Sequence, residues 1–118
     1  MGESTCAAVF YTTSAFNLKT PGKAKMDINT LMEIAMERCD TAVCAIKLMG
    51  SLAEEYGFYG SDPGSEEGGE VVSLADRTGS AWMFQILADD TGTSAVWAAQ
   101  VRVVMLYIYI YTYGGWNV

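Results

Sequence analysis

The chain has 118 residues, of which 51% are hydrophobic, so it can form one domain with a core and is not a disordered acidic tail. Its formal net charge of −7 and its pI of about 4.3 argue against nucleic-acid binding. Histidine is absent, which excludes a Cys-His or Ser-His catalytic pair and a histidine-based metal site within this chain.

The three cysteines, Cys6, Cys39 and Cys44, do not have C-x-x-C spacing. An odd number of cysteines without a recognisable framework predicts buried thiols in a reducing compartment rather than disulfides. The first residues have neither the basic segment nor the apolar segment of a signal peptide, and the sequence does not indicate a particular compartment.

Residues 5–12 are predicted to form a strand because Val9, Phe10 and Tyr11 have high β-propensity. A lysine-containing loop follows over residues 14–25. Asp27 is the expected N-cap of a helix over residues 28–39, and Asp40 or Thr41 that of a helix over residues 42–56. The expected apolar positions are Ile28, Leu31, Met32, Ala35 and Cys39 in the first helix, and Ala45, Met49, Leu52 and Tyr56 in the second, which Gly57 ends.

Residues 58–69 are predicted to be a loop. Asp62, Glu66, Glu67 and Glu70 fall in or beside it, but their spacing does not fit an EF-hand. We interpret them as acidic residues of a solvated loop, and we expect neither a metal nor a cofactor.

Three short strands, at residues 71–74, 81–87 and 93–100, are separated by Asp/Gly turns at 76–79 and 89–92. This pattern predicts an antiparallel meander. The middle strand is apolar on both faces, with Trp82, Phe84 and Ile86 on one and Met83 and Leu87 on the other. It therefore predicts a layered α/β protein whose sheet is covered on both sides. We expect Trp82, Phe84, Ile86 and Trp97 to pack on the second helix.

The order LMGSLAEEYGFYG, an acidic Gly-rich loop, GGEVVSLAD, AWMFQILADDTG and SAVWAAQ resembles the PepD-type dipeptidases. These are N-terminal-nucleophile cysteine hydrolases to which the secernins are related, and the resemblance covers most of residues 2–100. It implies an α/β (α+β) chain that is part of a four-layer αββα fold. It also implies that the full-length protein is a cysteine-type dipeptidase with a dipeptide substrate. A homo-oligomer is compatible with it. From the negative charge we expect no nucleic-acid partner, and because the apolar part of the tail at residues 101–118 is too short to span a bilayer we expect no membrane partner. The alternative is a non-catalytic, secernin-like protein that keeps the fold for interaction or secretion.

In the resembled family the nucleophile is an N-terminal cysteine, exposed by processing, within a Cys-Thr-Thr-like segment that this chain lacks. Cys6 is the only substitute, but Ala7, Ala8 and Val9 do not match the family's nucleophile strand. We interpret Cys6 as a buried structural thiol and expect no catalytic residue in this chain. By fold analogy, Ser4 and Thr5 are the best candidates for substrate contact; a hydroxyl pair satisfied at the start of a strand is the alternative.

Both ends of the sequence depart from the resembled family. Met1 stands almost directly before a segment that is internal in the relatives, so we interpret it as an internal methionine of a chain truncated at its front. Residues 1–100 are then part of the dipeptidase domain. Residues 101–118, with the Tyr-Ile repeat at 107–113, are interpreted as an unrelated tail encoded by translated intron; a genuine edge strand is the alternative. A chain of this extent would leave the sheet face of Met83, Leu87 and Val96 open.

Overall fold

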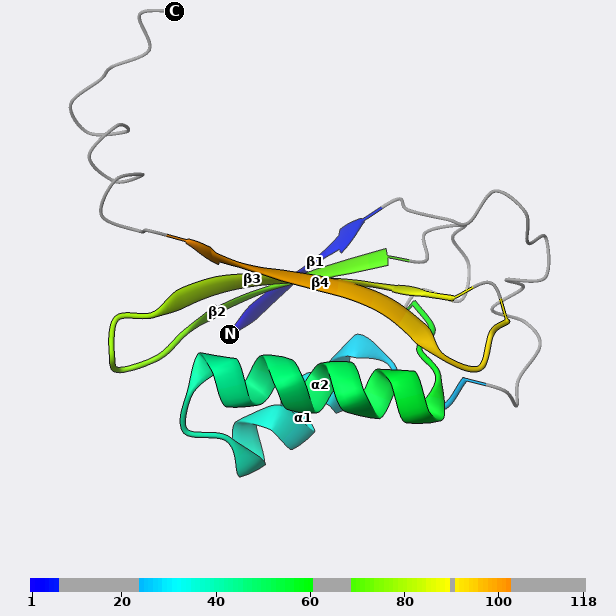
Figure 1. Cartoon of the computed structure of the whole chain (residues 1–118), viewed down its shortest axis with the longest axis horizontal. Coiled ribbons are helices and arrows are strands. Elements are labelled where there is room, and N and C mark those ends of the chain that lie inside the picture. Colours follow the sequence, from blue (N-terminus) through cyan, green and yellow to red (C-terminus); the bar gives the residue numbers. More distant parts are fainter. Residues whose placement is uncertain (7–23, 61–68, 90, 103–118) are drawn as a thin grey trace, which may run out of the picture.

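The computed structural model describes residues 1–6, 24–60, 69–89 and 91–102. In these residues the fold is α+β, with two helices and a four-stranded antiparallel sheet of order β1-β2-β3-β4. Both helices lie on the same face of the sheet (Figure 1). The elements are β1 (Gly2–Cys6), α1 (Ile28–Arg38), α2 (Ala42–Tyr56), β2 (Gly69–Ala75), β3 (Ala81–Ala88) and β4 (Ala95–Arg102).

The predicted helices are confirmed with their caps. The Asp27 carboxylate accepts a hydrogen bond from the Thr30 backbone N–H at 2.8 Å, which satisfies a donor that the first turn of α1 leaves free. Thr41, one of the two expected caps, does the same for α2 by accepting from the Cys44 N–H at 3.2 Å. Gly57 ends α2 with a φ of 76°, a conformation that costs glycine nothing.

The predicted meander is also confirmed. Gly79, in the turn between β2 and β3, and Gly92, between β3 and β4, both have positive φ. The first strand differs from its prediction because it begins at Gly2 rather than Thr5; residues 7–12 lie outside the described part of the chain. β4 continues two residues beyond Gln100, to Arg102.

Cross-strand register determines which side chains face the helices. Phe84 lies opposite Val72 on one side and Ala99 on the other, and Ile86 lies opposite Trp97. Phe84 and Ile86 are buried as predicted, whereas Trp82 and Trp97 are only half-buried against the core. The largest apolar side chains of this core are Ile28, Leu31, Ile46, Met49, Phe58, Val72, Leu74, Phe84 and Ile86.

The buried stripe of α2 corrects one prediction. Ala45 and Met49 are buried and Leu52 is partly buried, as expected, but Tyr56 is 37% exposed. The stripe passes through Ile46, Gly50 and Ala53 instead. Tyr56 occupies the last turn, where the helix ends at Gly57, so it projects to solvent beyond the packed face.

The opposite face of the sheet is not covered by any described element, so the prediction of coverage on both sides does not hold for the described residues. On this face Met83 and Leu87 are partly exposed, Gln85 between them is exposed, and Val96 is 47% exposed. Within the described residues the side chains of Met83, Leu87 and Val96 are therefore accessible, as expected, and the truncation on which that expectation rests stays a prediction.

Cys39 and Cys44 form a disulfide, so the prediction of free thiols is wrong for this pair. The tight connection between α1 and α2 brings their Cα atoms to 5.5 Å, within the range that a disulfide spans. The spacing of Cys39 and Cys44, with four residues between them across a helix–helix turn, was therefore the sequence signal for this disulfide. The odd number of cysteines obscured that signal. The side chain of Cys6 lies outside the described part.

Candidate functional site

The two residues predicted to contact substrate lie on the edge strand β1. Ser4 is opposite Val71 and Thr5 is opposite Glu70, register positions that belong to different faces of the sheet. Ser4 is exposed on the face away from the helices. The side chain of Thr5 lies outside the described part, so its role in contacting substrate stays a prediction.

Glu70 is the residue that the sequence interpretation misplaced. It was expected in a solvated acidic loop, but it belongs to β2 and is only 1% exposed, opposite Ile86. Asp62, Glu66 and Glu67 lie outside the described residues. The signal was present in the sequence, because Glu70 alternates in phase with Val72 and Leu74 and therefore shares their core-facing side.

Glu3 on β1 shares that face and interacts with Glu70. The pKa of Glu3 is raised above its ordinary value by partial desolvation, then by the negative charge of Glu70 and by a side-chain hydrogen bond with it. Glu3 remains exposed to solvent, which screens this effect. Two carboxyl groups in contact concentrate negative charge at one position, so this pair can bind a cationic group such as an ammonium.

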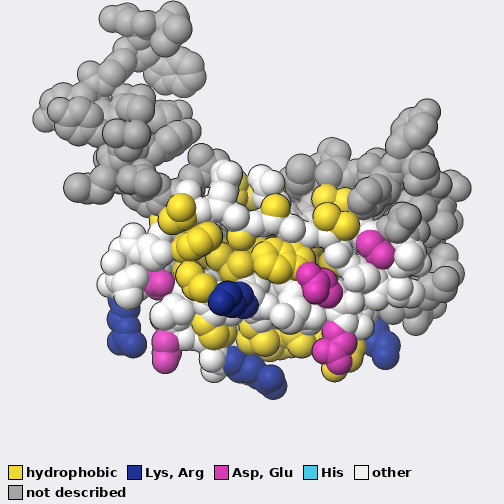
Figure 2. Space-filling view, in the orientation of Figure 1, with side chains coloured by type: hydrophobic (Ala, Val, Ile, Leu, Met, Phe, Trp, Pro, Cys, Tyr) yellow, Lys and Arg dark blue, Asp and Glu magenta, His cyan; other side chains and the backbone are white. Residues whose placement is uncertain are grey.

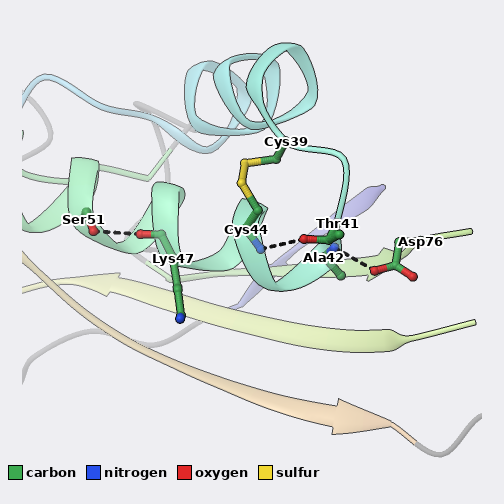
Figure 3. The surroundings of a disulfide bond; sticks show 7 residues. All are labelled: Cys39, Thr41, Ala42, Cys44, Lys47, Ser51 and Asp76. Atoms are coloured by element: carbon green, nitrogen blue, oxygen red, sulfur yellow. Dashed lines mark hydrogen bonds between the residues drawn. A yellow bond between two sulfur atoms is a disulfide. The ribbon is translucent and has the colours of Figure 1, made fainter. Parts of the chain in front are cut away.

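A groove of about 380 Å³ lies elsewhere, between the end of α1, the start of α2 and the β2–β3 turn. Charged groups reach it from Asp40 in the helix connection and from Asp76 and Arg77 in the turn. Asp76 Oδ2 accepts a hydrogen bond from the Ala42 N–H at 2.9 Å, so an internal carboxylate already occupies the positive end of α2 (Figure 3). Neither Ser4 nor Glu70 lines this groove.

The disulfide lies beside the same helix connection, joining the end of α1 to the first turn of α2 (Figure 3). Its two sulfurs are therefore not free to act as nucleophiles or metal ligands. In the described ranges no group of three or more His, Cys, Asp or Glu residues is placed to hold a metal ion. Neither described helix is long and apolar enough to cross a membrane.

Within the described residues, the arrangement thus offers an acidic pair beside β1 and a groove at the helix connection, separated from each other along the sheet. By register Thr5 shares the face of the acidic pair, whereas Ser4 lies on the opposite face of the sheet. The groove was not anticipated from the sequence. Comparison of the chain with known protein families, with curated proteins and with solved structures finds no match.

Proposed function

We propose that this chain belongs to a cysteine-type dipeptidase of the PepD type, in which it contributes one helix layer and one sheet layer of an αββα fold. The observation that supports this is the arrangement of the described elements. A consecutive helix pair packs on one face of an antiparallel sheet whose last three strands form a meander (Figure 1). That is the content of one half of such a four-layer fold.

The open sheet face supports the same proposal. Its side chains include Val71, Met83, Leu87 and Val96, all at least partly accessible in the described structure. Two sheets that pack face to face lie about 10 Å apart and interdigitate apolar side chains of this kind. A second sheet on this face would bury those side chains.

The chemistry proposed for the full-length protein does not need histidine. An N-terminal cysteine thiolate attacks the peptide carbonyl, and its own α-amine, directly or through a water, accepts the proton. This chain contributes no such nucleophile. Its contribution would be to substrate binding, since Glu3 and Glu70 provide negative charge on the face that Thr5 shares by register, and this charge suits the ammonium group of a dipeptide.

The test begins with the messenger RNA, which should encode in frame a processed Cys-Thr-Thr-like segment before residue 1. The full-length protein should hydrolyse dipeptides and should lose activity when that cysteine is changed to alanine. Changing Glu70 to Gln should raise KM for dipeptides, and should not do so for substrates whose amino group is blocked. A folded full-length protein with no such cysteine and no turnover would contradict the proposal and favour the secernin-like, non-catalytic alternative.

The chain itself should hydrolyse no dipeptide. Turnover by this chain that is abolished by Cys6→Ala would identify Cys6 as the nucleophile and overturn its assignment as a structural thiol.

A further inference from the structure

We propose that the outer edge of β4, which no other described strand pairs with, binds a second copy of this chain together with the exposed side of α2. The two β4 strands would pair antiparallel around a two-fold axis perpendicular to the sheet. The result is one continuous sheet with both α2 helices on the same face. This surface is distinct from the open sheet face and does not depend on the dipeptidase proposal.

The edge of β4 has no feature that discourages pairing. Among the described strands, β4 pairs with β3 alone and ends the sheet order. The strand runs for eight residues, Ala95–Arg102, without proline, glycine or a bulge in its register. Its one charged residue is Arg102, at the end of the strand. Edge strands that do not pair with another chain usually carry proline, a bulge or charged side chains, which prevent such pairing.

The side chains around this edge are apolar and accessible. Val101, on the helix-facing side of β4, is 55% exposed, and Val43 on the adjoining part of α2 is 40% exposed. Figure 2, in the orientation of Figure 1, shows hydrophobic side chains gathered on this side of the molecule with basic and acidic groups among them. A surface of this composition matches the apolar centre and charged rim of an interface.

The charges on α2 identify the partner as a second copy. Lys47 and Glu54 are seven residues apart and both are exposed, so they lie on one stripe of the helix. Figure 3 shows Lys47 pointing from α2 away from α1 and toward the strands. Glu54 accepts a hydrogen bond from Trp97 Nε1 at 2.7 Å, which fixes it beside the middle of β4.

A two-fold axis at the middle of β4 reverses the direction of α2 in the second copy. Gly50, between Lys47 and Glu54, lies against Trp97 near that midpoint. The reversal therefore places Lys47 of each copy next to Glu54 of the other. The stripe is complementary to itself, as a symmetric interface requires.

Spacing also permits this arrangement. Because α2 packs beneath both β3 and β4, it is set back from the edge of the sheet. Neighbouring strands lie about 4.8 Å apart, and each α2 lies about half that distance inside its own β4. The axes of the two α2 helices would therefore be about 10 Å apart, which is the spacing of packed helices.

The test is the oligomeric state of the full chain, measured by sedimentation velocity between about 1 and 100 μM, a range chosen to include weak symmetric interfaces. We expect a species of twice the 12.8 kDa chain mass. Lys47→Glu should raise the dissociation constant about tenfold or more, because it places like charges together at two symmetric positions. Glu54→Lys should do the same, and the double exchange Lys47→Glu with Glu54→Lys should restore association.

Glu33→Lys, a charge reversal on the exposed side of α1, is the matched control and should leave association unchanged. Circular dichroism of each variant separates loss of association from loss of folding. A chain that is monomeric throughout the range would overturn the proposal, as would a dimer that the Lys47→Glu change leaves intact. A monomer whose β4 amides are protected from hydrogen exchange would show that another segment of the same chain covers the edge, which also overturns it.

Discussion

The Ala42 N–H donates a hydrogen bond to Asp76 Oδ2 at 2.9 Å, across 34 residues of sequence. The same carboxylate organises its own turn, because Oδ1 accepts from the Thr78 N–H and more distantly from the Ser80 N–H. Asp76 thus fixes the β2–β3 turn and caps α2 at once. It couples the helix layer to the sheet layer at the end of the molecule where the disulfide also lies.

Replacing Asp76 should therefore lower the stability of the whole fold. Asp76→Asn keeps one acceptor oxygen without the charge, whereas Asp76→Ala removes both, so we expect the melting temperature to fall in the order wild type, Asn variant, Ala variant. Asp40→Ala, which removes an exposed carboxylate from the same helix connection, is the control. Equal melting temperatures for Asp76→Ala and Asp40→Ala would contradict the assigned cap.

The pH dependence follows from the same contacts. Hydrogen bonds from the Thr78 side chain and the Ala42 N–H lower the pKa of Asp76 below its ordinary value of 3.8. The folded state therefore binds this proton less tightly than the unfolded state. The stabilisation is present above the unfolded pKa and is lost as pH falls through the folded value. Urea denaturation from pH 7 to pH 2.5 should show the difference between wild type and Asp76→Ala shrinking below about pH 4.

Gly50 is the second point where the two layers depend on each other. A Cβ at this position would lie 2.4 Å from Trp97 Cε2, so the indole ring occupies the space that any larger residue needs. Gly50→Ala gains about 1 kcal/mol of helix propensity, but we expect a net loss of about 1–3 kcal/mol from overpacking, measured by urea denaturation. Ser51→Ala, at the neighbouring exposed position, should have a much smaller effect.

Trp97→Phe provides the complementary variant for this contact. It removes the indole atoms nearest to Gly50, so Gly50→Ala should cost less in a chain that already carries Trp97→Phe than it does in wild type. If the two changes are strictly additive, the contact between Gly50 and Trp97 does not limit the packing of α2 on the sheet.

Local signals were enough to predict much of this fold. Asp27 and Thr41 cap helices because their side chains act within three residues, and Gly57 ends α2 through its own φ. The buried stripe of α2 depends on which side of the helix meets Trp97, a contact that periodicity alone does not specify. Gly50 was missed for that reason, whereas the predicted burial of Tyr56 was wrong because α2 ends there, beyond the packed face.

The candidate site was less accessible to sequence reasoning. Glu70 follows an acidic Gly-rich segment, and the composition of that segment obscured the two-residue alternation of β2 by which Glu70 is buried. The disulfide depends on a tight turn between two helices, and the number of cysteines gives no information about that turn. The groove requires three segments distant in sequence to meet, so no local pattern could reveal it.

The disulfide should add stability without being required for folding. The bond between Cys39 and Cys44 closes a short loop, with a sequence separation of 5, for which chain entropy gives about 2 kcal/mol. Dithiothreitol should lower the unfolding free energy of the wild type by this amount. It should have no effect on a variant with both Cys39→Ser and Cys44→Ser. Thiol titration of the unfolded chain should give one reactive thiol before reduction and three after it; three before reduction would contradict the bond.

The carboxyl pair of β1 and β2 should have a pH dependence opposite to that of Asp76. Desolvation, the charge of Glu70 and the hydrogen bond with it raise the pKa of Glu3 above its ordinary value of 4.5, so the folded state binds this proton more tightly than the unfolded state. The stability from protonated Glu3 is fully present below the unfolded value and is lost as pH rises through the folded value. Glu3→Gln, which mimics the protonated form, should therefore raise the melting temperature at pH 7 and lose this advantage near pH 4. Glu33→Gln, on the exposed side of α1, is the control for removing one negative charge from an acidic chain. If the two variants gain equally at pH 7, the effect belongs to net charge and Glu70 does not act on Glu3 through direct contact.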